Sequence, residues 1–322
     1  MARRDKFVPP PPTGKMNKKI NVAVIGAGRL GSAHARVYKE LPQANLIGVC
    51  DIEKSRAQSI AESLQTQTFL DYRELFNQVQ AVSIATPTLI HYKIAREFLL
   101  RGINVLVEKP FTSTVLEADR LLEIARRHKL IIQVGHIERF NSAFEAIKPI
   151  CRHPKFIEVH RLSGFPGRSL DIGVVLDLMI HDIDIILGLV QSPIKRVEAV
   201  GINVLTRRED IANARITFKN GCVCNLTASR ISDESTRKIR IFLKDTYISL
   251  DYKNEEADIY RKDGDKITKE AIWIKKEEPL KKELSSFLDC VRSKKQPLVS
   301  GIEGRQALKT ALHIQNLIWK KG

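Results

Sequence analysis

The chain has 322 residues and a mass of 36.5 kDa, with 43% hydrophobic and 28% charged residues. This composition excludes a small disulfide-stapled module and a disordered tail, and the length leaves room for about two domains. The net charge is +16, of which +5 lies in residues 1–19 and +7 in residues 261–322. Because the excess lies at the two ends and no basic recognition element is evident, we expect solvated faces and no nucleic-acid partner.

Other classes of protein are excluded by what the chain lacks. No apolar run approaches the roughly 20 residues that cross a bilayer, and no export signal precedes the first predicted strand. The five cysteines form no C-x-x-C pair, so we expect neither a disulfide framework nor a metal site. The sequence therefore predicts a cytoplasmic protein with no membrane partner.

Residues 1–18 contain the run Pro9–Pro12 and no strand or helix period, which predicts a mobile extension. From Ile20 onward, short apolar strands alternate with amphipathic helices. The predicted strands are 20–25, 46–50, 81–85, 104–107 and 131–134, and the predicted helices are 30–41, 54–64, 89–100 and 115–128. Such alternation is typical of a doubly wound parallel sheet, here over residues 19–135.

The pattern changes over residues 136–322. Predicted helices at 140–150 and 174–189 are followed by closely spaced strands and then by two final helices. The strands are expected at 197–205, 212–218, 222–229, 239–243 and 247–252, and the helices at 280–291 and 306–319. This part is predicted to be a second α/β domain with an open, mainly antiparallel sheet. Because one sheet face lacks obvious covering helices, we expect a homodimer or homotetramer.

The motif Gly26-Ala27-Gly28-Arg29-Leu30-Gly31 follows the first predicted strand and opens the first helix. Its glycines allow close backbone approach, and the helix N-terminus offers free amides to a pyrophosphate. Asp51 ends the second strand 20 residues after Gly31, where a carboxylate can accept hydrogen bonds from the adenosine ribose. Asp51 favours NAD over NADP because it repels a 2′-phosphate, although the nearby Lys54 and Arg56 keep NADP open.

Two further motifs carry chemistry. Glu108-Lys109-Pro110 ends a parallel strand, at the sheet edge where such sheets bind ligands, and a lysine there can stabilise an alkoxide or relay a proton. Asp177 and His181 are four residues apart within an apolar predicted helix, and Asp184 follows one turn later. A histidine and a carboxylate on one helical face can act as a general acid/base and its partner, or hold substrate hydroxyls.

Taken together, the chain resembles the glucose-fructose oxidoreductase / inositol dehydrogenase / MocA family of nicotinamide-dependent sugar dehydrogenases. The resemblance rests on the glycine loop, the stretch Ala85-Thr86-Pro87-Thr88-Leu89-Ile90-His91, the Glu108-Lys109-Pro110 tripeptide, and Asp177 to His181 with Asp184. It implies a Rossmann domain followed by a second domain with an open sheet. It also implies that Lys109, Asp177 and His181 are catalytic. The implied lining of the cofactor site is Thr86, Pro87, His91 and Glu108.

A narrower resemblance lies in Gly135-His136-Ile137-Glu138-Arg139-Phe140-Asn141. It is similar to the segment G-H-x-E-R-F-N-P of members that oxidise C3 of UDP-linked N-acetylamino sugars, with Ser142 in place of the proline. His136, Arg139, Asn141 and Asp184 are thus candidate substrate-binding residues. Arg139 could grip a phosphate or carboxylate, or could pair with Glu138 or Glu145 instead.

The sequence thus predicts an NAD-dependent oxidoreductase that removes a hydride from a secondary alcohol of a sugar or nucleotide sugar. His181 would take the hydroxyl proton, Lys109 would stabilise the developing negative charge, and Asp177 would hold or orient the reacting groups. Two alternatives stay open. One is another dehydrogenase of the family, acting on inositol, a free aldose, a dihydrodiol or an imine. The other is a non-catalytic regulator that binds NAD as a sensing ligand.

Overall fold

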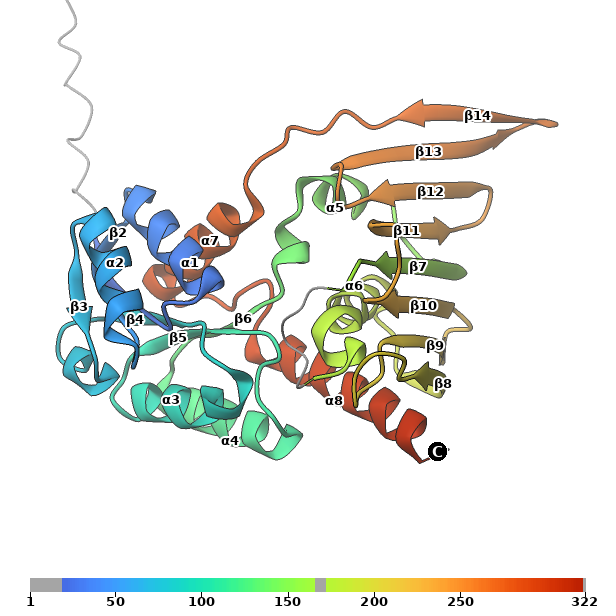
Figure 1. The fold of residues 1–322 in the computed structure, drawn as a ribbon. Coiled ribbons are helices and arrows are strands. Elements are labelled where there is room, and N and C mark those ends of the chain that lie inside the picture. Colours follow the sequence, from blue (N-terminus) through green and yellow to red (C-terminus); the bar gives the residue numbers. More distant parts are fainter. Residues whose placement is uncertain (1–18, 166–171, 321–322) are drawn as a thin grey trace, which may run out of the picture.

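The computed structural model describes residues 19–165 and 172–320, so the predicted extension 1–18 lies outside the described residues. The chain builds two sheets that stand side by side, with most helices packed against them (Figure 1). The predicted α/β class, with one parallel and one mainly antiparallel sheet, is confirmed.

The first sheet is parallel throughout, in the order β3-β2-β1-β4-β5-β6. Its strands are β1 (Ile20–Ile25), β2 (Ala44–Cys50), β3 (Gln67–Phe69), β4 (Ala81–Ile84), β5 (Asn104–Glu108) and β6 (Ile132–Gly135). Its helices are α1 (Arg29–Glu40), α2 (Lys54–Leu64), α3 (Thr88–Leu100) and α4 (Val115–His128), with a short 3₁₀ turn, η1 (Tyr72–Leu75). The strand order reverses between β1 and β4, which places a ligand crevice at their carboxyl ends.

The central strands read as short apolar runs because both of their faces are covered. Every residue of β4 is buried, and so are all but one residue of β1 and all but one of β5. In Figure 1, α1, α2 and α7 (Pro279–Ser293) lie on one side of this sheet, and α3 and α4 lie on the other. Because helices cover both faces of the sheet, a ligand can approach it only at the ends of its strands.

The second sheet has the order β14-β13-β12-β11-β7-β10-β9-β8, and all neighbours are antiparallel except β7 and β10. Its strands are β7 (Phe156–Leu162), β8 (Ile194–Ile202), β9 (Ile211–Phe218), β10 (Val223–Ser229), β11 (Thr236–Phe242), β12 (Thr246–Asp251), β13 (Glu256–Asp263) and β14 (Lys266–Ala271). The other helical segments are η2 (Ile137–Phe140), α5 (Ser142–Ile147), η3 (Val175–Met179), α6 (Ile180–Val190) and α8 (Gly301–Trp319).

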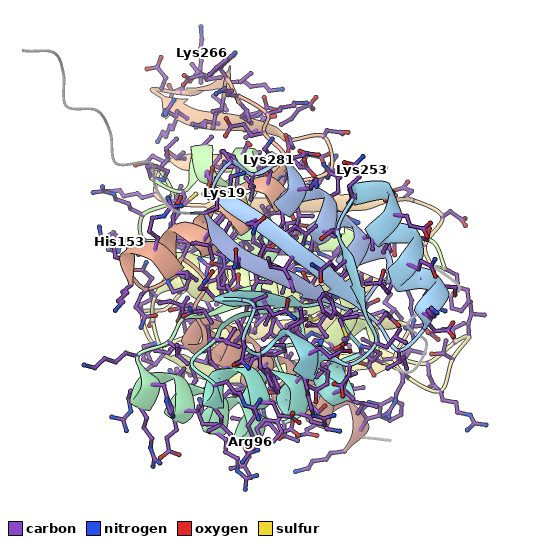
Figure 2. All side chains as sticks on the ribbon, turned by 90° about the vertical axis from the view of Figure 1, so that its left-hand side faces the viewer. Lys19, Arg96, His153, Lys253, Lys266 and Lys281 are labelled. Atoms are coloured by element: carbon purple, nitrogen blue, oxygen red, sulfur yellow. The ribbon has the colours of Figure 1, made fainter. Side chains whose placement is uncertain are left out.

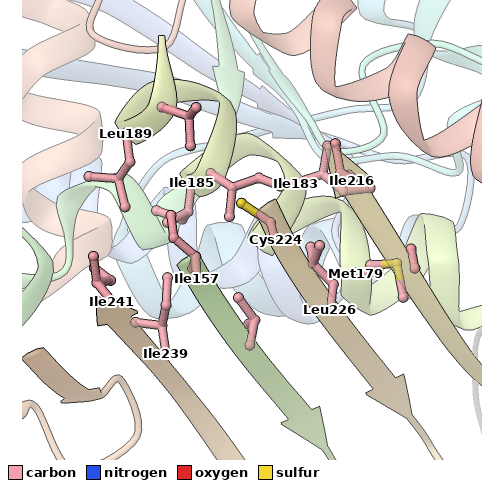
Figure 3. Close-up of a cluster of buried hydrophobic side chains, with 14 of the residues drawn as sticks. Ile157, Met179, Ile183, Ile185, Leu189, Ile216, Cys224, Leu226, Ile239 and Ile241 are labelled. Carbon is pink, nitrogen blue, oxygen red and sulfur yellow. The ribbon is translucent and has the colours of Figure 1, made fainter. Parts of the chain in front are cut away.

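The second core lies between this sheet and the helices on its inner face. Figure 3 shows Ile157, Leu226 and Ile239 on neighbouring strands, facing Met179 and Ile183 of the helical segment. Alternate residues of the same strands point the other way: Glu158, Lys238 and Arg240 line a shallow hollow on the outer face. The face of the sheet towards α6 is therefore mainly apolar, and the opposite face is charged.

The predicted elements of the first sheet agree with the structure to within two residues at each end, whereas β3 was missed. In the second sheet, β7, β13 and β14 were missed, and the strand expected to reach residue 205 ends at Ile202. The helix predicted over 174–189 is present, but its first part, Val175–Met179, is a π-helix that leads directly into α6. Among the described residues, no helix combines the length and apolar character needed to cross a membrane.

Candidate active site

The glycine loop joins β1 to α1 at the strand-order reversal. A Cβ at Gly26 would lie 2.4 Å from the Ala85 carbonyl oxygen, and one at Gly31 would lie 1.8 Å from the Gly26 oxygen. By contrast, a Cβ at Gly28 meets no atom within 4 Å. Gly28, Arg29 and Leu30 are exposed, and no side chain caps the N-terminus of α1. The loop thus packs tightly on one side and offers open backbone on the other, which fits a pyrophosphate group.

Asp51 lies directly beside this loop. Its Oδ2 accepts a hydrogen bond of 2.6 Å from the Ala27 amide, and its Oδ1 accepts one of 2.9 Å from the Glu53 amide. Each carboxylate oxygen keeps a second lone pair for a ribose hydroxyl. The next residue, Ile52, is 92% exposed, which sequence reasoning did not single out. An apolar side chain held in water beside a carboxylate with free lone pairs is suited to cover an adenine ring.

Thr86 and Pro87 lie in the turn between β4 and α3, and His91 lies in the first turn of α3. The buried His91 ring lies between two carbonyls, with Nε2 2.8 Å from the Thr86 oxygen and Nδ1 3.0 Å from the Pro110 oxygen. His91 therefore ties this turn to the segment after Lys109 and has no ring nitrogen left for a ligand. The Thr86 hydroxyl is buried near the glycine loop without a partner among the described residues, so it can serve a bound group.

Glu108 points into the protein instead of lining the edge of the sheet. Its Oε1 lies 3.0 Å from Nε2 of His34 on α1, and its Oε2 accepts a 3.3 Å hydrogen bond from the Lys109 amide. Burial opposes ionisation, but the hydrogen bond to His34 and the nearby charges, among them Lys109, together outweigh it, so the pKa of Glu108 is lowered. Its side chain supports the backbone that presents Lys109.

Lys109 and Asp177 meet although 68 residues separate them in sequence. Lys109 Nζ donates to the Asp177 backbone oxygen at 2.6 Å and to its carboxylate Oδ1 at 3.0 Å. Asp177 lies inside the π-helical segment, so four-residue spacing does not by itself align it with His181. We include Asp177 in the candidate site because it contacts Lys109.

His181 lies near these charges at the start of α6. Burial lowers its pKa well below the ordinary value, and the positive charges of Lys109 and Arg161 lower it further. Its buried Nδ1 has no partner among the described residues. A neutral imidazole in this state can accept a proton.

His136 packs edge-to-face against His181, with ring centroids 6.1 Å apart. It is buried, and neither ring nitrogen has a partner within the described part of the chain. Burial also lowers the pKa of His136. Two imidazoles that are both neutral thus form one wall of the site.

The remaining predicted substrate residues are engaged inside the protein. Arg139 makes a buried ion pair with Asp184, at 2.6 Å from Nε and 3.2 Å from Nη2. Asn141 caps α5 through its Oδ1 and donates to the Tyr252 carbonyl. Arg139 and Asp184 line a cavity of about 560 Å³ together with Lys148, Gln191 and Glu303, but neither Lys109 nor His181 borders it. The pairing of Arg139 with Glu138 or Glu145 that the sequence left open does not occur.

A second buried charge group lies close by, and sequence reasoning missed it. Arg161 on β7 donates to both carboxylate oxygens of Asp182 at 2.8 Å and to Glu138 at 2.9 Å. These contacts tie the second sheet to α6 and to η2. The signal in the sequence was weak, because β7 itself was not recognised and Asp182 has no spacing that marks a partner. Within the described ranges, no cluster of three or more potential ligand residues is arranged to hold a metal.

The chain is similar to known proteins over most of its length. Residues 20–136 match the oxidoreductase family with an NAD-binding Rossmann fold (GFO_IDH_MocA), and residues 153–249 match the GFO/IDH/MocA C-terminal domain. The UDP-N-acetylglucosamine 3-dehydrogenase of Acidithiobacillus ferrooxidans is 36% identical over 303 residues, covering 92% of this chain and 96% of the relative. A solved structure of that enzyme superposes with a TM-score of 0.89 and covers 93% of this chain and 98% of the other.

Inositol dehydrogenases are also similar to the chain, at lower identity. The myo-inositol 2-dehydrogenase of Thermotoga maritima is 26% identical over 312 residues, covering 90% of this chain and 93% of the relative. The structure of myo-inositol 2-dehydrogenase from Lactobacillus plantarum has a TM-score of 0.81 at 19% identity, covering 94% of this chain and 98% of the other, and shows the shared fold alone.

Proposed function

Because the chain belongs to the Gfo/Idh/MocA family of NAD-binding oxidoreductases, we propose that its substrate is a UDP-linked N-acetylamino sugar, oxidised at C3. The observation that carries the proposal is the contact of Lys109 with Asp177 near a neutral His181, at the edge where the glycine loop opens. The substrate class is supported by the 36% identity to UDP-N-acetylglucosamine 3-dehydrogenase and by the segment from Gly135 to Asn141.

Each residue has a distinct task in this reaction. The bound nicotinamide supplies the hydride acceptor. His181 accepts the proton of the sugar hydroxyl, since its imidazole is neutral and unpartnered at Nδ1. Lys109 places a positive charge on the oxygen as negative charge develops there, and Asp177 holds the Lys109 ammonium in position. General acid/base catalysis of this kind contributes roughly 10² to 10⁴ in rate.

The cofactor we propose is NAD. One oxygen of Asp51 accepts from the Ala27 amide of the glycine loop and the other from the Glu53 amide, so the carboxylate is held where the adenosine ribose would lie. A 2′-phosphate there would meet this negative charge and lose the ribose hydrogen bonds. Lys54 and Arg56, at the start of α2, are exposed cations that leave NADP as the alternative.

The test is a substrate panel with NAD or NADP, scored by the absorbance of the reduced cofactor. UDP-N-acetylglucosamine, its uronic acid, N-acetylglucosamine and myo-inositol are compared at equal concentration. The proposal expects turnover of a UDP sugar with NAD and a kcat/KM at least about tenfold lower with NADP. Turnover of myo-inositol alone would reject the nucleotide-sugar substrate and keep the dehydrogenase. NAD binding without turnover of any alcohol would favour the regulator.

A further inference from the structure

The inner face of the second sheet carries two arginines directly opposite each other. Arg161 on β7 and Arg237 on β11 are partners in the antiparallel register. The parity of β11 shows which way Arg237 points: Ile239 and Ile241 are buried in the core beneath α6, whereas Thr236, Lys238 and Arg240 line the hollow on the outer face. Arg237 therefore shares the face that carries the site.

The cations around His181 differ in how fully they are paired. Lys109 is held by Asp177, Arg139 by Asp184, and Arg161 by Asp182 and Glu138. The side chains of these three are at most 14% exposed.

Arg237 is in a different situation. Its side chain is 52% exposed, and its recorded contact is with Glu138 at 4.0 Å, a carboxylate that Arg161 already holds at 2.9 Å. Its charge nevertheless reaches His181, because it is among the positive charges that lower the pKa of that residue. Arg237 is thus a largely unpaired guanidinium close to the proposed reacting centre.

We propose that Arg237 is the anion subsite of the enzyme and binds the diphosphate or the sugar carboxylate of a nucleotide sugar. The inference rests on the proposed function and names the group that recognises the charged part of the substrate. A guanidinium presents parallel donors that match a phosphate or carboxylate, and a half-exposed one gives up little hydration in binding it. Arg139, to which the sequence pointed for this role, is held in a buried ion pair by Asp184.

The experiment compares Arg237→Met and Arg237→Lys with a matched control, Arg240→Met. Arg240 lies three residues further along the same strand, is 48% exposed and pairs with Glu158, but it points to the outer face. Binding of UDP, UDP-N-acetylglucosamine and its uronic acid to the enzyme with reduced cofactor is measured by calorimetry, and KM and kcat are measured by turnover.

Arg237→Met is expected to weaken UDP-sugar binding about 10- to 100-fold and to raise KM more than it lowers kcat. Arg237→Lys should restore part of the affinity, and Arg240→Met should stay within about twofold of the wild type. The wild-type affinity should also fall with added salt more steeply than that of Arg237→Met. Loss of UDP affinity would assign the diphosphate, whereas a loss confined to the uronic acid would assign the sugar carboxylate.

Equal loss in Arg237→Met and Arg240→Met, or no loss in either, would overturn the subsite while the substrate assignment stands. A wild-type enzyme that neither binds nor turns over any UDP sugar fails the proposed function itself, and the subsite falls with it. The two failures are distinguished because the first appears only in the variants and the second already appears in the wild type.

Discussion

At the scale of single residues, His181 and Lys109 differ in charge and in partners, and we propose a different catalytic task for each. His181 is kept neutral by burial and by nearby positive charge. Lys109 instead donates hydrogen bonds to two oxygens of Asp177, one of the backbone and one of the carboxylate. A neutral base beside a fixed cation is the arrangement that removing a proton from a hydroxyl requires.

Replacing either residue should therefore affect turnover and spare cofactor binding. Lys109→Met and His181→Ala are each expected to lower kcat about 100-fold or more, because in the proposed mechanism both act on the reacting oxygen and not on the adenosine half. The dissociation constant for NAD, measured by fluorescence titration, should stay within a fewfold. A variant that kept near-normal kcat with its substrate would remove that residue from the mechanism.

The pH dependence of kcat/KM should carry the same signature. His181 accepts a proton only when it is neutral, and its folded pKa lies below the ordinary value of about 6.5. The neutral form thus persists at lower pH, so the acid limb of the profile should lie well below pH 6.5. The residual activity of Lys109→Met should show this limb shifted upward, since one of the depressing charges is gone. An acid limb near pH 7 in the wild type would contradict the assignment.

At the scale of elements, the turn between β1 and α1 shows how backbone space decides what a residue can be. Gly26 has φ +101° and faces the Ala85 carbonyl, whereas Gly28 has an extended backbone and open space around its missing Cβ. A side chain at Gly26 would clash with the fold itself, whereas a side chain at Gly28 would hinder only a group that approaches the loop from outside.

Alanine at these two positions should separate stability from binding. Gly26→Ala should unfold at a clearly lower temperature, because alanine at this φ is strained and its Cβ meets a carbonyl oxygen. Gly28→Ala should unfold near the wild-type temperature yet bind NAD at least about tenfold more weakly, since its Cβ occupies the approach of the pyrophosphate. Thermal melts and NAD titrations of both variants measure the two effects. Unchanged NAD affinity in Gly28→Ala would place the cofactor elsewhere.

The elements also show how much the sequence could predict. The strands of the first sheet were recognisable because both of their faces are buried, which leaves unbroken apolar runs. β7 was missed because its exposed positions carry Glu158 and His160, and β14 because none of its residues is buried. The π-helical segment that precedes α6 leaves no mark in the hydrophobic pattern, which fits an ordinary helix equally well.

Parts of the site could be predicted where a single motif and the strand before it determine the position of the residues. The glycine loop, Asp51 and Lys109 lie at strand ends, and their positions follow from the topology of the sheet. Partners that come from distant segments could not be read in this way. Arg139 meets Asp184 across 45 residues, and Arg161 meets Asp182 from a strand that the pattern did not show. Arg237 gains meaning only once β11 is placed beside β7.

At the scale of the whole molecule, the charge is spread over the surface. Figure 2 places Lys266 at the top, His153 at the left and Arg96 at the bottom of the molecule, with Lys19, Lys253 and Lys281 between them. The outer face of the second sheet carries charged side chains and a hollow, and no helix covers it in Figure 1. The dimer or tetramer expected from this face stays a prediction. Light scattering should give a mass well above 36.5 kDa, and a single-chain mass at working concentration would contradict it.

The stability of the whole fold should depend on pH through Glu283 of α7. Its side chain is buried, and neither carboxyl oxygen has a partner among the residues that the structure describes. Burial raises its pKa well above the ordinary value, and the negative charges of Glu108 and Asp184 raise it further. Glu283 is therefore protonated in the folded protein under conditions in which it ionises in the unfolded chain.

The sign of the effect follows from proton linkage. A carboxyl whose folded pKa is raised contributes fully below the unfolded pKa of about 4.3, and this contribution is lost as the pH rises towards the folded pKa. Glu283→Gln keeps the shape of the side chain and cannot ionise. Its melting temperature relative to the wild type should therefore climb as the pH rises above the unfolded pKa of about 4.3, whereas Glu256→Gln, at an exposed position of β13, should show a nearly constant difference. A constant difference for Glu283→Gln would mean that the carboxyl finds a compensating partner, or water, inside the fold.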